Sequence, residues 1–399
     1  MRMLRSATLC ILAIAGTTSA AGPTPDDPPA PPPTASPRVA APATSTLPVE
    51  TFAFPALVDP TRGDAARTET TRTPILPRRR QEEREGDKER RSEPGTPSAA
   101  SAPAGRRVPI KVHAPTTGGP YPVVVVSHGA GGDWDTHFAQ AAELAAGGYV
   151  VLCLEHVGSN RERMSQGSRA MKNILAMTRD ADEVLARPKD VSFAIDRATE
   201  WNATDAKLKG RLDLSRIGVM GHSFGAFTTM VACGMRPALD WLVPTVAPGK
   251  GLGPDLRDQR VKCGVALSPQ GADEPFFIRA SFASLKVPLL GISGTEDRQQ
   301  GGLPATNRRD AFKLWPEGAH RFVWLTNARH LDFTDSTGSS RHAMSSPTRE
   351  DVQPIVRAAT LLFFNANLKA DSESAKRLTG DVLKPYLHGA VNHVEVLSK

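Results

Sequence analysis

The sequence predicts an α/β fold in which a mostly parallel central sheet carries helices on both faces, preceded by a disordered N-terminal extension. Two observations predict the sheet. From about residue 105 onward, apolar stretches alternate with stretches of helical periodicity, which is typical of parallel strands joined by helices. Residues 121–127 include four consecutive valines, and such a continuous β-branched run indicates a strand buried on both faces.

The first 20 residues have the organisation of an export signal. Arg2 and Arg5 precede a short apolar stretch at residues 7–15, and small residues follow, so we expect cleavage after Ala20. The apolar stretch is too short to span a bilayer. A core helix is the alternative, but it leaves the adjacent proline-rich stretch unexplained. We therefore expect an exported protein, either secreted or retained in the envelope.

Residues 21–105 are rich in Pro, Ala, Ser and Thr and contain a mixed charge run at residues 78–91. This composition buries too little apolar surface to offset the entropy of ordering, so we expect a disordered linker. Within it, residues 51–58 could supply an edge strand that pairs with residues 107–113. The charge run is either a solvated segment or a weak attachment to anionic surfaces.

Charge and cysteine content narrow the class of protein further. The formal net charge of the 399 residues is +7, which is mild, and the chain has no nucleic-acid-binding motif, so we expect no nucleic-acid partner. Without the leader, which contains Cys10, the cysteines are Cys153, Cys233 and Cys263. An odd number cannot all pair within the chain. We interpret them as buried thiols, and a Cys233–Cys263 disulfide stays open as an alternative.

One folded domain is expected at residues 106–370, with a C-terminal tail at residues 371–399 that packs on the domain or trails from it. After the strand at 121–127, the expected strands are residues 149–154, 216–220, 261–268, 287–293 and 321–326. The expected helices are residues 137–146, ending at Gly147 and Gly148; 160–202, interrupted near Pro188; 226–233; and 348–368.

The motif Gly221-His222-Ser223-Phe224-Gly225 joins the strand at 216–220 to the helix that follows. Strand, sharp turn and helix in this order are the context in which Gly-x-Ser-x-Gly indicates a nucleophilic serine. Gly221 and Gly225 are needed because the strand and the helix approach each other closely around a strained turn. The motif is short, so a chance match is the alternative, and the residues at the other strand ends decide between the two.

In an open parallel sheet, ligands bind beyond the carboxyl ends of the strands. Asp297 follows the strand at 287–293, and His330 follows the strand at 321–326. With Ser223 they have the order Ser, acid, His of one class of hydrolases that form an acyl-enzyme. We expect Ser223 to attack a carbonyl, His330 to accept its proton, and Asp297 to hold the imidazole in the required tautomer.

Other residues compete for two of these roles. Glu296 is adjacent to Asp297 but would point the opposite way, so we prefer Asp297 as the acid. His320 precedes the last of these strands and His342 lies in a flexible stretch, so we prefer His330 as the base. No spacing of His, Cys and Asp resembles a zinc site and no phosphate-binding loop is present, so we expect neither a metal nor a cofactor.

The glycine-rich stretch at residues 127–132 follows the strand at 121–127. Its backbone N–H groups are suited to an oxyanion, although an ordinary tight turn is the alternative. We expect one oxyanion donor to be the N–H of Phe224 and the other that of Ala130, with Gly129 as a less favoured choice. His128 and His222 flank the site and are expected to shape it through hydrogen bonds.

Together these segments resemble the α/β-hydrolase superfamily, and within it the secreted dienelactone-hydrolase-like and platelet-activating-factor-acetylhydrolase-like serine esterases. The segments that carry the resemblance are residues 125–132, 155–160, 187–193, 221–226 and 265–271. The resemblance implies an α/β-hydrolase fold, a short-chain acyl ester or phospholipid acetyl ester as substrate, and Ala130 and Phe224 as oxyanion donors. Dienelactone hydrolases proper use a cysteine where this chain has Ser223, which argues against their substrate.

The expectation from the sequence is therefore a monomeric serine hydrolase that acts on a small-molecule or lipid ester. A peptidase related to prolyl oligopeptidases is one alternative, but the chain has no propeller-like repeat. A catalytically inactive binding protein on the same scaffold is another. Residues 241–244, Trp-Leu-Val-Pro, form either an apolar pocket wall or lid, or a packed loop.

Overall fold

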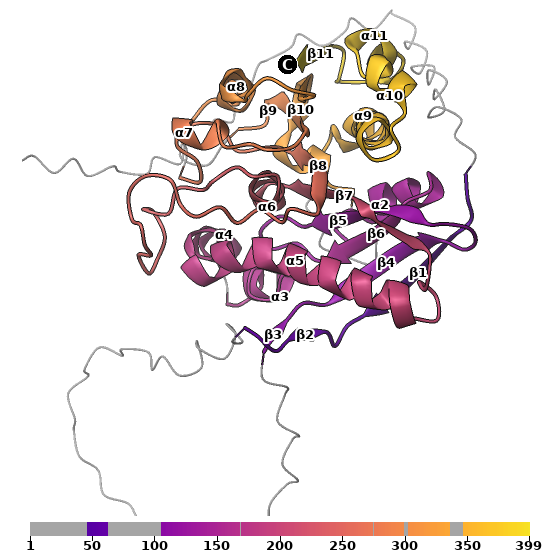
Figure 1. The fold of residues 1–399 in the computed structure, drawn as a ribbon. Helices are drawn as coiled ribbons and strands as arrows, with labels where there is room; N and C mark the ends of the chain where they lie inside the picture. The colour runs from indigo at the N-terminus through magenta and orange to yellow at the C-terminus, as the bar shows by residue number, and fades with distance from the viewer. Residues whose placement is uncertain (1–45, 63–104, 168, 274, 299–301, 336–345) are drawn as a thin grey trace, which may run out of the picture. The chain divides into compact units, whose positions relative to one another are not determined.

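The computed structural model describes residues 46–62, 105–167, 169–273, 275–298, 302–335 and 346–399 (Figure 1). All of them belong to the larger of two units in the chain, Arg38–Lys399. The predicted leader, the charge run at 78–91 and His342 lie outside the described residues.

In the described residues the central sheet has nine strands in the order β1-β4-β6-β5-β7-β8-β9-β10-β11 (Figure 1). The strands are β1 (Val49–Phe54), β4 (Ile110–Pro115), β5 (Tyr121–Ser127), β6 (Val150–Leu154), β7 (Leu212–His222), β8 (Val261–Leu267), β9 (Leu289–Glu296), β10 (Arg321–Arg329) and β11 (Val394–Ser398). The six strands from β6 to β10 in this order are parallel, which confirms the predicted mostly parallel sheet.

Both edges of the sheet are antiparallel. At one edge β1 pairs with β4, so that residues before and after the 63–104 segment lie side by side. This is the edge pairing that the sequence predicts, with bounds shifted by a few residues. A short second sheet joins β2 (Val58–Asp59) to β3 (Arg106–Arg107). At the other edge β11, from the predicted tail, pairs with β10.

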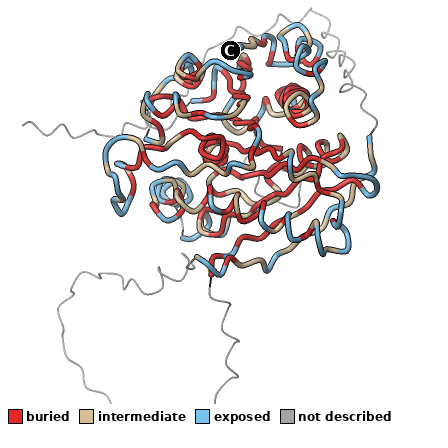
Figure 2. The backbone as a smooth tube through the Cα atoms, viewed as in Figure 1, coloured by how far each residue is buried: buried red, intermediate tan, exposed pale blue. Residues whose placement is uncertain are grey.

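Helices cover both faces of the sheet. Along β5, Val123 and Val125 belong to one hydrophobic cluster together with α5 (Ala181–Thr204) and α6 (Phe224–Ala232). Val124 and Val126 belong to another, with α2 (Phe138–Ala146) and α9 (Arg349–Leu368). Alternate residues of a strand point to opposite faces, so the two clusters are two cores separated by the sheet. Figure 2 shows the buried backbone running through the central strands.

The shorter helices lie in the connections. They are α3 (Arg161–Met164), α4 (Ala170–Arg179), α7 (Arg279–Phe282), α8 (Thr306–Asp310), α10 (Ser372–Arg377), α11 (Gly380–Leu383) and the 3₁₀ turns η1 (Ala311–Leu314), η2 (His330–Phe333) and η3 (Lys384–Tyr386). No helix among the described residues is long and apolar enough to cross a membrane.

The expected interruption near Pro188 is wrong. The helices divide at Asp180, whose extended backbone ends α4 and whose carboxylate accepts hydrogen bonds from the N–H groups of Asp182 and Glu183. An aspartate with this geometry, followed by acidic residues in the first turn, is a strong helix start. Helix α5 then continues through the buried Pro188, although a proline removes one backbone hydrogen bond.

Cys153, Cys233 and Cys263 are buried and unpaired in the structure. The alternative disulfide between Cys233 and Cys263 is therefore not formed. Burial raises the pKa of both thiols, so they act as small apolar core residues.

Candidate active site

The turn between β7 and α6 holds Ser223 in a strained conformation. Its φ of 56° and ψ of −113° lie outside the regions that residues with a side chain usually adopt. A Cβ atom on Gly225 would overlap the carbonyl oxygen of Ser127, and one on Gly221 would overlap the carbonyl of Gly225. Close backbone contact thus requires both glycines, and it presents the Ser223 side chain at the carboxyl end of the sheet.

Ser223, His330 and Asp297 lie within hydrogen-bond distance of one another in series. The distance from Ser223 Oγ to His330 Nε2 is 2.9 Å, and that from His330 Nδ1 to Asp297 Oδ1 is 2.8 Å. Asp297 directly follows β9 and is buried, whereas the His330 side chain is 36% exposed. His330 directly follows β10, where Asn327 has a φ of 60° and the register with β9 shifts.

The Asp297 carboxylate is surrounded by donors. Ser268 Oγ donates to Oδ1 at 2.9 Å, Ser293 Oγ donates to Oδ2 at 2.7 Å, and Arg308 Nε lies 3.4 Å from Oδ2. Burial acts to raise the pKa of Asp297, but Arg308 and the hydrogen bonds from His330 and Ser293 hold that pKa well below its usual range. The carboxylate therefore stays ionised at neutral pH.

These contacts assign the proton positions on His330. A carboxylate accepts only, so Nδ1 carries the proton that is directed at Asp297, and Nε2 is left to accept from the Ser223 hydroxyl. Ser268 Oγ lies 2.9 Å from the same Nδ1. His222 Nε2 donates to the His330 carbonyl oxygen at 2.7 Å and so fixes the backbone beneath the ring. Gln270 Nε2 likewise donates to the Ser223 carbonyl at 2.8 Å.

Phe224 and Ala130, the two predicted oxyanion donors, both line the cleft beside Ser223. Phe224 is the first residue of α6, so its N–H has no acceptor within the helix. Ala130 lies in the glycine-rich turn after β5, and its N–H makes no backbone hydrogen bond within the described residues. These two N–H groups are therefore the candidates for donating to an oxyanion that forms at Ser223.

The cleft has a volume of about 610 Å³. Its apolar lining includes Met164, Met171 and Ile174 from the segment that contains α3 and α4, together with Phe276. Arginines also line it: Arg161, Arg298, Arg308 and Arg349. Residues 241–244 do not belong to the lining within the described residues. Trp241 instead packs edge-on against the lining residue Phe276, with the two ring centres 4.6 Å apart.

The two predicted site-shaping histidines take different positions. His222 lines the cleft, and burial together with the neighbouring His330 ring lowers its pKa well below the usual value. His128 lies behind the cleft, where its Nδ1 donates to the Gly129 carbonyl at 2.6 Å and its Nε2 accepts from the N–H of His156 at 3.0 Å. The His128 ring is therefore neutral and braces the glycine-rich turn.

The competing residues lie outside this arrangement. Glu296 is exposed and pairs with Arg298 at 3.5 Å. His320 is buried and accepts the N–H of Leu289 at 3.2 Å, and burial lowers its pKa to about 4. No group of His, Cys, Asp and Glu in the described part of the chain is arranged to hold a metal ion.

Sequence reasoning missed several polar residues that support the site. Ser268, Ser293 and Arg308 hold Asp297, and Gln270 holds Ser223. Ser268 follows β8 directly, so the strand-end rule applied to every strand would have found it. Arg308 lies in α8, with no spacing that connects it to Asp297.

The strained serine turn between β7 and α6, at the carboxyl end of this sheet, defines an α/β-hydrolase. Comparison with known proteins narrows the class. The family described as "Platelet-activating factor acetylhydrolase, isoform II" matches residues 100–163 and 158–270. The chain is therefore similar to platelet-activating factor acetylhydrolases across residues 100–270. The matched residues include Ala130 and Ser223 but end before Asp297 and His330.

Individual relatives agree with the family match. A platelet-activating factor acetylhydrolase of Cavia porcellus is 26% identical over 201 residues, which are 41% of this chain and 38% of the relative. That of Canis lupus familiaris is 25% identical over 269 residues, 60% of this chain and 52% of the relative. A bis(hydroxyethyl) terephthalate hydrolase of Streptomyces coelicolor is 31% identical over 75 residues, 19% of this chain and 24% of the relative. The chain thus spans about half or less of each of these relatives.

Proposed function

We propose that the protein is a serine hydrolase that cleaves carboxylic esters through an acyl-enzyme intermediate. The observation that carries the proposal is the hydrogen-bonded series from Ser223 through His330 to Asp297, with distances of 2.9 and 2.8 Å, at a cleft of about 610 Å³. A nucleophile needs a base within hydrogen-bond reach, and the base needs a group that orients it. The series is consistent with both conditions, and it lies on the side of the sheet where ligands of α/β folds bind.

In the proposed mechanism, Ser223 Oγ attacks the ester carbonyl while His330 Nε2 takes the hydroxyl proton. The carbonyl oxygen gains negative charge and is stabilised by the N–H groups of Phe224 and Ala130. His330 then gives the proton to the leaving alcohol. In the second half of the reaction, His330 takes a proton from the attacking water and returns one to Ser223 Oγ as the acid product leaves. Asp297 stays ionised and stabilises the imidazolium throughout.

For the substrate we propose small-molecule or lipid esters with short acyl chains, including acetyl esters of phospholipids. The names of the similar proteins support an ester, because they are acetylhydrolases and a terephthalate ester hydrolase. The apolar side chains on α3 and α4 suit a lipid or aryl portion, and the arginines around the cleft suit an anionic group near the ester.

We also propose that the protein is exported and acts as a monomer. The buried, unpaired thiols are compatible with an oxidising compartment because they are shielded from oxidants. Detection of the mature N-terminus after Ala20 in the extracellular or envelope fraction would test the export proposal, and an intact Met1 there would contradict it.

A fluorophosphonate probe followed by a series of p-nitrophenyl esters tests the main proposal. We expect the full chain to be labelled at Ser223 and to hydrolyse the acetate faster than the octanoate. A chromogenic peptide that ends in proline should remain uncleaved, and its cleavage would favour the peptidase alternative. A folded protein that is neither labelled nor active would be a binding protein on this scaffold.

A further inference from the structure

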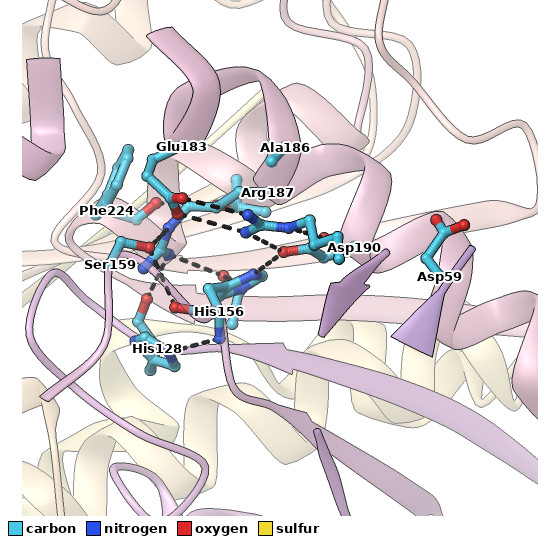
Figure 3. Close-up of polar contacts among 12 residues, drawn as sticks. Asp59, His128, His156, Ser159, Glu183, Ala186, Arg187, Asp190 and Phe224 are labelled. Carbon is cyan, nitrogen blue, oxygen red and sulfur yellow. Dashed lines mark hydrogen bonds and ion pairs between the residues drawn. The ribbon is translucent and has the colours of Figure 1, made fainter. Parts of the chain in front are cut away.

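Behind the glycine-rich turn lies a buried polar network that the proposed mechanism does not use (Figure 3). Its centre is Arg187, whose side chain is fully buried. Within the described residues, the hydrogen bonds of its guanidinium go to uncharged oxygens: Ser159 Oγ at 3.0 Å, the His128 carbonyl at 2.7 Å and Ser127 Oγ at 3.4 Å. A buried guanidinium without a directly bonded carboxylate is costly to keep, which calls for a reason beyond packing.

Arg187 contacts both sides of the proposed oxyanion hole. On one side, its Nη1 binds the carbonyl of His128, two residues before Ala130 in the glycine-rich turn. On the other side, its guanidinium carbon lies 4.1 Å from the centre of the Phe224 ring, in a cation–π contact. Figure 3 shows the Arg187 side chain between Phe224 and the residues of the turn. One planar group therefore sets the spacing between the two segments that carry the N–H donors.

The rest of the network neutralises the nearby carboxylates. Arg106 binds Asp190 through Nε at 2.8 Å and Nη2 at 2.9 Å, and its Nη1 lies 3.2 Å from Glu183. Asp190 also accepts from His156 Nδ1 at 2.8 Å. Because Arg106 is bonded to both acids, Arg187 is left to bind the oxygens of the turn.

We propose that Arg187 is a positioning residue that fixes the distance between the Phe224 and Ala130 N–H groups and thereby the strength of the oxyanion hole. This inference rests on the proposed esterase function. Lysine cannot replace the arginine, because an ammonium on a flexible stem offers neither the planar fork that binds two oxygens nor a face that stacks on a ring. The geometry assigns the role to the fork and not to the positive charge.

The test compares Arg187→Lys with Arg106→Lys in the full chain. Both changes alter a buried arginine of the same network, but Arg106 contacts Asp190 and Glu183 and neither segment of the oxyanion hole. Losing an oxyanion donor typically lowers kcat about 100- to 1,000-fold. Because Arg187→Lys displaces the donors without removing them, we expect kcat to fall about 10- to 100-fold, with KM nearly unchanged. Arg106→Lys should lower the melting temperature and keep kcat within about threefold.

A second readout separates positioning from simple stabilisation. A boronic acid that forms a tetrahedral adduct on the serine should lose affinity in Arg187→Lys in parallel with kcat, whereas the product carboxylate should bind as before. If Arg187→Lys does not fold, Ser159→Ala removes one tether of the guanidinium and should lower kcat about threefold to tenfold. Equal losses of kcat in the Arg187 and Arg106 variants would overturn the inference, as would unchanged kcat and boronate affinity in a destabilised Arg187→Lys.

Failure of the proposed function can be told apart from failure of the inference. If the wild-type chain neither hydrolyses esters nor reacts with fluorophosphonate, the esterase proposal fails. Crystal structures of the wild type and Arg187→Lys then decide the inference, because it requires the Ala130 and Phe224 nitrogens to move relative to each other. Nitrogens at the wild-type separation would refute it.

Discussion

Two Ser–His–Asp series lie on opposite sides of the glycine-rich turn, and they have nearly the same geometry. In the cleft, Ser223, His330 and Asp297 are linked at 2.9 and 2.8 Å. Behind the turn, Ser127 Oγ lies 2.8 Å from His156 Nε2, and His156 Nδ1 lies 2.8 Å from Asp190. The hydrogen-bond pattern alone therefore does not distinguish a nucleophile from a structural serine.

The surroundings make the difference. Ser127 is fully buried within a regular strand, and Arg187 Nη1 lies 3.4 Å from its hydroxyl oxygen. Ser223 is only partly buried and lines the cleft together with Phe224 and Ala130. A reacting carbonyl can reach Ser223 but has no path to Ser127. Access to the serine therefore distinguishes Ser223 from Ser127, and the proposed oxyanion donors would add to this difference.

Electrostatics separates the two histidines as well. Burial, together with the adjacent Arg187 guanidinium, lowers the pKa of His156 to about 3, against the opposing influence of Asp190. His156 therefore stays neutral through the physiological range and makes a poor proton acceptor. The His330 side chain is instead 36% exposed and lines the cleft.

The largest effect is expected from replacing the serine of one series while the other series stays intact. Ser223→Ala should lower kcat for p-nitrophenyl acetate roughly a millionfold, to the background, because no nucleophile remains. Ser127→Ala should keep kcat within about tenfold while lowering the free energy of unfolding by about 1 to 3 kcal/mol, since His156 loses a buried partner. Fluorophosphonate labelling and urea unfolding of the two variants give the comparison. Loss of labelling in a folded Ser127→Ala would contradict the division of roles.

The two aspartates give the next largest contrast. Asp297→Asn should lower kcat about 10,000-fold at neutral pH, because an amide favours the wrong tautomer of the histidine. Asp190→Asn should cost about 3 to 5 kcal/mol of stability, because it leaves buried Arg106 poorly paired, and should lower kcat no more than about tenfold. Stopped assays at 25 °C and urea titrations measure both quantities. Glu296→Gln serves as the exposed control. It should change kcat by no more than about twofold and the free energy of unfolding by no more than about 0.5 kcal/mol.

The contrast also explains what the sequence can predict. The parallel sheet follows from the alternation of apolar strands and helices, and the strand-end rule nominates Ser223, Asp297 and His330, which the structure brings within hydrogen-bond distance. Arg187 was not foreseeable, because a charged residue in a predicted helix is normally solvated. Its burial depends on residues brought from the ends of β5 and β6, and no local spacing encodes that meeting.

The turn at Asp180 teaches the same lesson at the level of local structure. Proline at 188 suggested a helix boundary, yet the capping carboxylate of Asp180 sets where α5 begins. The Asp180 carboxylate supplies hydrogen-bond acceptors that the start of α5 needs. Pro188 removes only one backbone hydrogen bond from a helix whose face is buried in the core, so the effect of Asp180 is the stronger one.

The smallest effect concerns pH. The folded pKa of His156 is about 3, below the usual value near 6.5 that applies to the unfolded chain, so the unfolded state binds the proton more readily. The stability contributed by neutral His156 is fully present above pH 6.5 and is lost as pH falls toward 3. Burial lowers the pKa of His113 and His137 to about 4 with the same sign. Burial raises the pKa of Asp335 to about 6. Protonation of Asp335 therefore stabilises the folded protein as the pH falls below 6, which opposes the effect of the histidines.

We therefore expect the free energy of unfolding to decrease between pH 6.5 and 5 by up to about 1.4 kcal/mol per pH unit for each such histidine. Urea unfolding at several pH values measures the slope in the wild type and in His156→Gln, whose slope should be smaller by up to one proton. His393→Gln removes an exposed histidine and is the matched control. A His156→Gln slope equal to that of the wild type would mean that His156 is protonated in the folded protein, and the buried series would then not be the neutral brace that its geometry indicates.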